Sequence, residues 1–236
     1  MKKLALLITA VLVALPACTA VSLGSDRVQE HARQSYPAAA ITSVRVDNIS
    51  GLVEIVAANG ANVVVDSTKH GGSQDALAHT HIDIQQNGGE LRIQTKYDHS
   101  GGWFGANNGA SVSYVIHVPA RMSVDIHNVS GPIAVTGVAG DVTASEVSGT
   151  VKASLGRVAA SRKIAMSTVS GSITVQIAKN SDAHVQAKTV SGGIHAFFPA
   201  DFHKGYVGES LSGTIGAGSG SMKFSTVSGG IDITPQ

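Results

Sequence analysis

Cysteine, aromatic residues and charge are all scarce in this chain. Its 236 residues include one cysteine and one tryptophan, 4% are aromatic, 14% are charged, and the formal net charge is +1. With a single cysteine the chain cannot form an internal disulfide, so its stability must come from a packed core. The near-neutral charge argues against nucleic acid as a partner and against a polybasic membrane patch.

A helical pattern is also missing. After the first 17 residues, no segment carries an apolar period of 3.6 residues. Valine, isoleucine, alanine, serine, threonine and glycine dominate instead, with 27 glycines in all. This composition favours flat, stacked β-strands, and the chain is long enough for one elongated domain with a buried core.

The N-terminus has the pattern of an export signal. Two lysines precede an apolar run over residues 4–15, which is too short to span a bilayer as a mature helix. The run ends in Leu-Pro-Ala-Cys at residues 15–18, which resembles the lipobox of bacterial lipoproteins. The resemblance implies lipidation of Cys18 and, with Thr19 next to it, an exported lipoprotein of the outer membrane, facing the periplasm or the cell surface. The alternative is an ordinary secretory signal with an incidental cysteine.

The composition predicts three parts along the chain. Residues 1–17 form the signal peptide, and residues 18–40 form the lipidated cysteine and a tether, in which a polar stretch could make a helical turn. Residues 41–236 form a single β-solenoid domain, with less regular strands over 41–128 and regular repeats over 129–236.

The second half of the chain repeats one short motif. An aliphatic residue, a serine and a glycine recur six times, each time followed by apolar residues at alternate positions. The six serines are Ser130, Ser148, Ser170, Ser191, Ser212 and Ser228. Subtracting successive serine numbers gives steps of 18, 22, 21, 21 and 16 residues. A repeat of this length in strand-forming residues is typical of a solenoid. Ser50-Gly51 is a seventh, distant copy.

The side-chain pattern within one repeat predicts two strands joined at a corner. With the serine counted as zero, apolar residues occupy positions −6 and −4 before it and positions −1, +3 and +5 around it. In one copy these are Val142, Ala144, Val147, Val151 and Ala153, and we expect the aliphatic side chains at all five positions to be buried. Because a strand has a period of two, a change from even to odd positions requires a bulge or a corner. We therefore predict an all-β fold, a single-stranded parallel β-helix with coils of about 20 residues and right-handed connections. An antiparallel meander with Ser-Gly turns is the alternative.

The same segments resemble a known family. Residues 198–233, the Val-Pro-Ala step at 118–120 with the motif that follows it, and residues 47–53 are similar to the β-strand-repeat "putative adhesin" family. This is a domain of unknown function related to the GIN head domain. The resemblance covers about residues 41–234 and implies a secreted or envelope-anchored protein. It brings no catalytic residue that could be transferred to this chain.

Some parallel β-helices are enzymes that act on polysaccharides, and a retaining glycosidase needs two carboxylates about 5 Å apart. If the coils stack in chain order, no outward column of the repeats contains two neighbouring acids, and Glu209 lies beside Lys188 as a solvated pair. The column at position +4 would contain Lys152, Thr174, His195, Gly216 and Asp232. We therefore expect no enzyme and no cofactor, and keep a carbohydrate-active enzyme as the third hypothesis.

One strand has the residue types of a zinc site. His79, His81 and Asp83 alternate with two isoleucines, so they should share an outward face. The facing strand would present Arg92 and Lys96, which repel a cation, and no fourth ligand is apparent. We therefore expect no metal site and keep the three residues as weak candidates.

Trp103 and Phe104 lie in a glycine-rich segment and are the residues we expect to bind a partner, because exposed aromatic rings can stack on sugars or dock on proteins. A loop tucked against the solenoid is the alternative. Together these features predict a non-catalytic, lipid-anchored β-solenoid of the cell envelope that acts as an adhesin-like interaction surface. Its partners would be the membrane, through the lipid, and an envelope protein or glycan. The second hypothesis is a periplasm-facing envelope-stress or scaffold protein.

Overall fold

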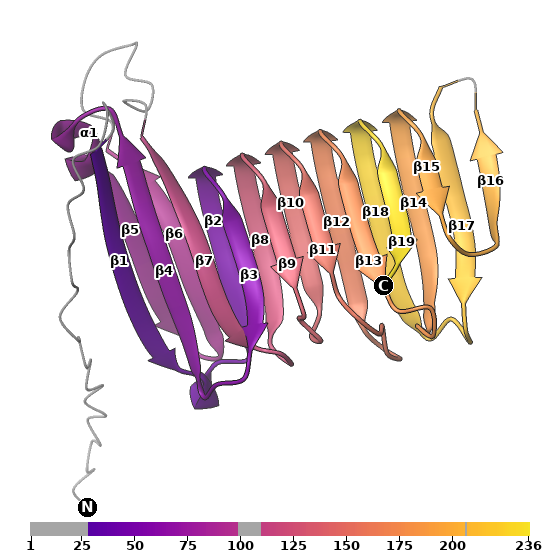
Figure 1. Cartoon of the computed structure of the whole chain (residues 1–236), viewed down its shortest axis with the longest axis horizontal. Coiled ribbons are helices and arrows are strands. Elements are labelled where there is room, and N and C mark those ends of the chain that lie inside the picture. The colour runs from indigo at the N-terminus through magenta and orange to yellow at the C-terminus, as the bar shows by residue number, and fades with distance from the viewer. Residues whose placement is uncertain (1–27, 99–109, 206) are drawn as a thin grey trace, which may run out of the picture.

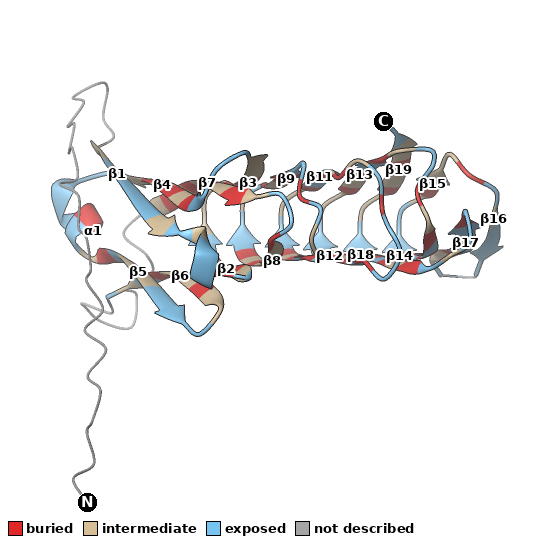
Figure 2. Ribbon diagram, turned by 90° about the horizontal axis from the view of Figure 1, so that it is seen from below, coloured by how far each residue is buried: buried red, intermediate tan, exposed pale blue. Residues whose placement is uncertain are grey.

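The chain folds into two β-sheets that lie against each other along an elongated body (Figure 1). This computed structural model describes residues 28–98, 110–205 and 207–236. Seen from the side, the sheets form two layers with the buried residues between them (Figure 2). The predicted all-β class is confirmed.

The two sheets contain nine and ten strands. In spatial order the nine-stranded sheet consists of β1 (Val28–Pro37), β4 (Asn62–Gly71), β7 (Ser111–Pro119), β3 (Val53–Ala58), β9 (Ile133–Thr136), β11 (Val151–Ser154), β13 (Ile173–Ile177), β19 (Ile231–Pro235) and β15 (Ile194–Ala196). The ten-stranded sheet consists of β16 (Ala200–Lys204), β17 (Glu209–Ile215), β14 (Ala183–Ser191), β18 (Gly220–Ser228), β12 (Lys163–Ser170), β10 (Val142–Ser148), β8 (Ser123–Ser130), β2 (Ser43–Ser50), β6 (Glu90–Tyr97) and β5 (Thr80–Asn87). The described helices are the short α1 (Gln74–Ala78) and the 3-10 turn η1 (Ala38–Ala40), and neither is long enough to cross a membrane.

Most of each sheet is parallel, and antiparallel pairing occurs at both ends of the ten-stranded sheet and at the β1 end of the nine-stranded sheet. From β6 to β14 and from β7 to β15 all neighbouring strands run in the same direction. Antiparallel pairing is confined to β1 with β4, β4 with β7, β5 with β6, β14 with β17, and β16 with β17. Each Ser-Gly corner in the parallel part joins a strand of one sheet to a strand of the other, as the change of parity predicts.

The coils do not stack in the order in which the chain makes them. The β18–β19 coil, the last in the sequence, lies between the β12–β13 coil and the β14–β15 coil. The β2–β3 coil, the first in the sequence, lies inside the stack, with β4 to β7 beyond it. Neighbours within each outward column follow from the sequence only if the coils stack in chain order. Assignments made on that assumption are therefore wrong wherever the last coil is involved.

The predicted corners are confirmed at six of the seven Ser-Gly copies, and the exception is Ser212-Gly213. There β17 continues straight through the motif and pairs antiparallel with β14. That part of the repeat prediction is wrong, because Leu211 and Ile215 on either side of the motif are both buried and keep an unbroken period of two.

The corner glycines stack with almost no space between coils. In spatial order they are Gly51, Gly131, Gly149, Gly171, Gly229 and Gly192. A Cβ on Gly171 would lie 1.8 Å from the carbonyl oxygen of Gly149, and one on Gly229 would lie 2.0 Å from that of Gly171. Gly171 also has a φ of +153°, which L side chains rarely adopt. The corner therefore needs glycine for space as well as for conformation.

A buried polar column lies directly beneath these glycines, at position −2 of each repeat. It consists of Asn48, Asn128, Glu146, Thr168, Thr226 and Thr189. Most of these side chains donate to a carbonyl of the neighbouring coil, as Thr226 does to Gly171 (3.1 Å) and Thr189 does to Gly229 (3.0 Å). Buried backbone carbonyls at the corner are satisfied in this way.

The aliphatic residue at position −1 is not in the core, which corrects the sequence prediction for Val147 and its equivalents. Val169 and Val227 are each 49% exposed, while residues at −6, −4, +3 and +5 are almost all buried. The strand before the corner keeps its alternation up to the serine, so the odd positions of that strand, including −1, point outward. After the corner the alternation is reversed, and the odd positions +3 and +5 point inward. Ile49, Val129, Val147, Val169, Val227 and Val190 thus form an exposed line, the valine ridge.

The tether prediction is also wrong in part, because the described fold begins at Val28. The strand β1 pairs antiparallel with β4 over its whole length, from Val28 opposite Gly71 to Pro37 opposite Asn62. Ten residues that lack a clear apolar alternation thus become the edge strand of the nine-stranded sheet.

Candidate functional site: a polar groove on the ten-stranded sheet

A shallow groove of about 550 Å³ crosses the outer face of the ten-stranded sheet. It runs over β10, β12, β18, β14 and β17 and reaches β16. Its lining alternates outward residues of these six strands with buried residues between them, so the core lies directly beneath it. The buried residues are Ala144, Met166, Ala187, Leu211 and Phe224.

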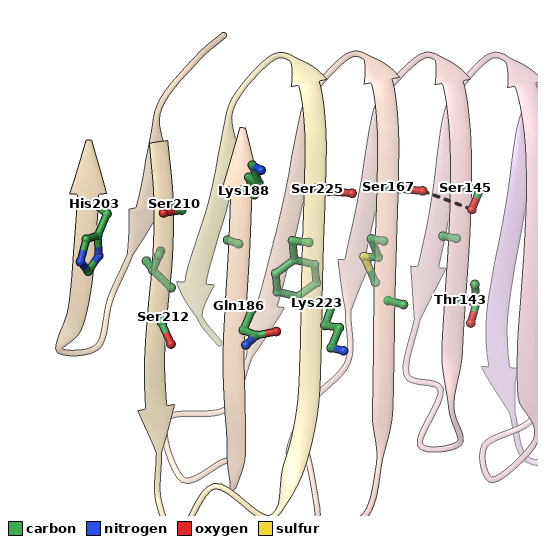
Figure 3. A pocket seen from close by; sticks show the side chains of 16 residues that line it. Thr143, Ser145, Ser167, Gln186, Lys188, His203, Ser210, Ser212, Lys223 and Ser225 are labelled. Atoms are coloured by element: carbon green, nitrogen blue, oxygen red, sulfur yellow. Dashed lines mark hydrogen bonds between the residues drawn. The ribbon is translucent and has the colours of Figure 1, made fainter. Parts of the chain in front are cut away.

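Two parallel rows of outward side chains line this polar groove (Figure 3). The upper row contains Ser145, Ser167, Ser225, Lys188, Ser210 and His203, one from each strand in spatial order. The lower row contains Thr143, Ala165, Lys223, Gln186 and Ser212, and on β16 Asp201 lies opposite Ser212 at its end. In the upper row the hydroxyl of Ser167 donates to Ser145 (3.2 Å). Small side chains keep the groove open, and hydroxyls and amides offer both donors and acceptors.

The two lysines in the polar groove, Lys188 and Lys223, are exposed and form no ion pair with any described residue. The outward positions of β10, β12, β18, β14 and β17 contain no carboxylate, since every second residue there is Ser, Thr, Ala, Gln, Gly, Lys, His or Val. On the sixth strand, β16, the outward acid is Asp201, opposite Ser212. Two lysines against one aspartate leave the polar groove with net positive charge.

The expected pairing of Glu209 with Lys188 is wrong. The antiparallel register of β14 and β17 places Ser210 opposite Lys188 and Glu209 opposite Thr189. Glu209 lies on the other side of its strand, where its carboxylate accepts a hydrogen bond from the backbone N–H of Ile194 (3.0 Å). Lys188 is thus left without the acid that chain order would have given it.

The other half of the same outer face, over β6, β2 and β8, has paired charges instead. Arg45 donates to Asp47 (3.0 Å) and to Asp125 (2.5 Å), and Arg92 contacts Asp47 at 2.7 Å. His127 lies 3.1 Å from Asp125. Burial raises the pKa of Asp47, but the hydrogen bonds from the two arginines outweigh it and hold that pKa below its usual value.

A second hollow lies between the paired half and the polar groove, below the valine ridge. Its lining includes Glu146, Asn128, His127 and Val147. Glu146 is 3% exposed, and one of its carboxylate oxygens has no hydrogen-bond partner among the described residues; the same is true of the side-chain oxygen of Asn128. Burial raises the pKa of Glu146, although hydrogen bonds from Asn128 and Ser148 work against this rise.

Of the weak metal candidates, His79 and His81 both lie near Asp98, at 3.7 and 2.7 Å, while Asp83 pairs with Lys96. His79 follows α1 instead of lying in β5, and Asp83 lies 2.6 Å from Lys96. In the described part of the chain, no group of three His, Cys, Asp or Glu residues is close enough to hold a metal ion. Cys18, Trp103 and Phe104 lie outside the described residues.

The column at +4 on the outer face of the nine-stranded sheet has a different order from the one expected. Asp232 lies between Thr174 and His195, because β19 lies between β13 and β15. It is the only carboxylate among the column residues named from the sequence, so this column does not supply the acid pair that a retaining glycosidase needs.

Sequence reasoning missed the polar groove. Its signal was present in the small and cationic residues at −3 and −5 of each repeat, such as Ser167 and Lys223. These positions become one surface only when the order of the coils is known.

Comparisons with known proteins agree with this architecture. Residues 120–234 match the model of the Toastrack DUF4097 family. The structure is similar to that of a "putative cell adhesion protein" from Clostridium sporogenes, with a TM-score of 0.60 and 11% identity over 88% of this chain and 100% of that one. A "putative adhesin" from Bacteroides fragilis has a TM-score of 0.39 and 11% identity over 86% of this chain and 96% of that one. No curated protein matches the chain. At this identity, the first likeness shows the fold alone.

Proposed function

Since residues 120–234 form a Toastrack DUF4097 domain, we propose that the chain is a non-catalytic, lipid-anchored protein of the cell envelope that acts as an adhesin-like interaction surface. The polar groove supports this most directly. It places unpaired lysines and hydroxyls on rigid stacked strands, which suits binding and lacks the acid pair of a glycosidase.

The anchor in this proposal is the lipid on Cys18, with the chain exported to the outer membrane. Support comes from the sequence, namely the lipobox-like residues 15–18 after an apolar run. Several acyl chains hold a protein firmly on a membrane, whereas a single chain binds only marginally.

The same proposal includes the finer description of the fold. We propose that the coils form a right-handed parallel β-helix with about 20 residues in each coil. The register of the corner serines supports it. Ser130 pairs with Ser148, and Ser148 with Ser170, which are separated in sequence by 18 and 22 residues respectively.

Substitution of the cysteine tests the anchor. The Cys18→Ser variant should leave the membrane fraction of cells and appear in the soluble exported fraction, because its lipid attachment site is gone. A Lys152→Gln variant, changed at an exposed residue of β11, should stay with the membrane. Membrane association of Cys18→Ser equal to that of wild type would overturn the anchor.

The alternative, a periplasm-facing envelope-stress or scaffold protein, differs in the side of the membrane that the domain faces. Labelling intact cells with a membrane-impermeant amine reagent separates the two, because a surface domain is tagged while a periplasmic control is not. Tagging only after the outer layer is breached favours the periplasmic role. Turnover of a glycan that depends on a carboxylate, such as that of Asp232, would favour the third hypothesis, a carbohydrate-active enzyme.

A further inference from the structure

We propose that the polar groove binds an extended acidic polysaccharide, a glycan chain bearing carboxylates, through Lys188 and Lys223 and the hydroxyl rows around them. This inference rests on the proposed function and names the ligand class of that surface. Its basis is the charge of the polar groove, its shape and the chemistry of its lining.

The charge of the polar groove favours an anionic ligand. Lys188 and Lys223 lie on the neighbouring strands β14 and β18, and the outward positions around them carry no acid. His203, opposite Ser210 at the far end, adds an imidazole that can hydrogen-bond to a ligand. The outward acid of the six strands is Asp201 on β16, two strands beyond Lys188, so neither lysine has an outward acid on an adjacent strand. Such a surface attracts anionic ligands, and this attraction weakens as salt is added.

The shape of the polar groove suits a chain and not a compact ion. The upper row has one residue on each of six adjacent strands, so it is about 24 Å long at a spacing of roughly 4.8 Å between strands. It is straight because the strands are stacked in register, and shallow because the side chains along it are small. A linear polymer that lies across the strands can contact both rows at once.

The lining favours sugars over other polyanions and over peptides. Ser167, Ser225 and Gln186 can exchange hydrogen bonds with sugar hydroxyls. Phe224, the aromatic residue of the lining, is 3% exposed and offers no ring face to a ligand, whereas single-stranded nucleic acid binds mainly by stacking its bases on aromatic rings. The outward positions of the six strands also contain no large apolar anchor of the kind that seats an amphipathic helix.

The valine ridge marks the upper border of this surface. Val147, Val169 and Val227 are exposed one step above Ser145, Ser167 and Ser225 on the same strands. A polymer in the polar groove would therefore have an apolar border beside the upper row, which contains Lys188, and the lower row with Lys223 on its other side, which limits how far it can shift along the strands.

The test measures binding of the full chain to immobilised polygalacturonate, a polymer of a uronic acid, with neutral dextran as the comparison. Wild type should bind polygalacturonate and not dextran, and the affinity should fall as salt is raised. The Lys188→Gln/Lys223→Gln variant should bind about fivefold to twentyfold more weakly, the range for losing two solvent-exposed charge contacts. Both side chains are exposed, so the fold should not change.

A matched control separates the polar groove from general charge. The Lys152→Gln/Lys179→Gln variant loses the same two charges from exposed positions outside the polar groove, and should bind like wild type. A further variant, Ser167→Ala/Ser225→Ala, keeps the charge and removes two hydroxyls. Its affinity should fall about twofold to fivefold if sugar hydroxyls are recognised.

Several results would overturn the proposal. One is that wild type binds dextran as tightly as polygalacturonate. Another is that the two lysine double variants lose affinity equally. The last is that oligo(dT) or phosphatidylglycerol vesicles retain wild type as well as polygalacturonate does. The envelope function is tested separately, since Cys18→Ser changes membrane fractionation and leaves the polar groove intact. Failure of polygalacturonate binding with normal fractionation would therefore reject the ligand and not the anchor.

Discussion

The two halves of the ten-stranded sheet present different outer faces on the same inner scaffold. Over β6, β2 and β8, Arg45, Arg92 and Asp47 form a network of ion pairs. Over β10 to β17, Lys188 and Lys223 have no such partners among the described residues. Both halves share the glycine stack and the buried polar column. The difference therefore shows that the corners and core hold the coils together, and that the outer face is free to specialise.

Removal of the C-terminal coil should have the largest effect on folding, and only the half with the polar groove should be affected. A chain that ends at Gly216 lacks β18 and β19, which pair with coils on both sides. We expect β14 to β17 to detach, because their main neighbours inside the stack are gone, while the paired half stays folded. Limited proteolysis with mass spectrometry should yield a resistant fragment that ends near residue 180.

A sequential solenoid would behave differently, because loss of its last coil would expose only one new end. Protection of the truncated chain up to Gly216 would therefore contradict the coil order described here. Full-length protein, digested in parallel, is the control and should be resistant through the C-terminal strands.

Substitution of corner glycines should be severe and equal in the two halves. Gly131→Val and Gly171→Val each place a side chain within 2.4 Å of a neighbouring carbonyl oxygen, at a φ that valine does not tolerate. We expect each to lower the free energy of unfolding by more than about 3 kcal/mol, since the backbone of two coils would have to move apart. Thermal or denaturant unfolding followed by circular dichroism measures this.

Two matched substitutions serve as controls for the glycine variants. Gly230→Val lies near the same corner but meets only one carbonyl oxygen, at 3.5 Å. Val169→Asp changes an exposed residue of the valine ridge and should alter the free energy of unfolding by no more than about 0.5 kcal/mol. A loss at Val169→Asp as large as that at Gly171→Val would mean that the ridge is part of the core.

Neutralising Asp47 should affect the paired half alone. Its side chain is 19% exposed and binds two arginines, so Asp47→Asn should cost about 1–2 kcal/mol of unfolding free energy at neutral pH. Because its folded pKa is below the unfolded value of about 3.9, this stabilisation is present above that pH and is lost as the pH falls through the folded pKa.

The measurement is thermal unfolding of wild type and Asp47→Asn between pH 2 and 7, where the two curves should converge in acid. The Lys188→Gln/Lys223→Gln variant, which changes the half that carries the polar groove, should unfold like wild type at every pH. A constant gap between wild type and Asp47→Asn down to pH 2 would show that the carboxylate charge is not what stabilises the network.

Glu146 stands at the border of the two halves and should give the smallest effect, with the opposite sign. Burial raises its folded pKa, so its contribution to stability is full below the unfolded pKa of about 4.3 and is lost as the pH rises through the folded pKa. Glu146→Gln should therefore stabilise the fold by about 1 kcal/mol at neutral pH and by almost nothing near pH 3. A glutamine variant that is less stable than wild type at pH 7 would show that the hydrogen bonds to the carboxylate outweigh the cost of burying its charge.

The local pattern of the chain was sufficient to predict much of the fold. The corners at Ser148-Gly149 and Ser170-Gly171 and the inward residues around them follow from alternation and from the need for glycine. Val147 was misplaced because an apolar residue was assumed to be buried, although the alternation itself points it outward. The edge strand β1 was missed because its residues show no apolar alternation, and its pairing with β4 is a contact between distant segments.

The polar groove could not be predicted, and the reason lies in the repeats. Each coil presents the same Ser-Gly corner and the same alternating apolar face, so nearly any coil can stack on any other. Periodicity therefore fixed where the chain turns and which side chains point inward or outward. Only the tertiary structure decided that the last coil lies between β12 and β14, because that choice depends on contacts between distant segments. It thereby set Lys223 beside the strand of Lys188, while the antiparallel β17 kept Glu209 out of reach.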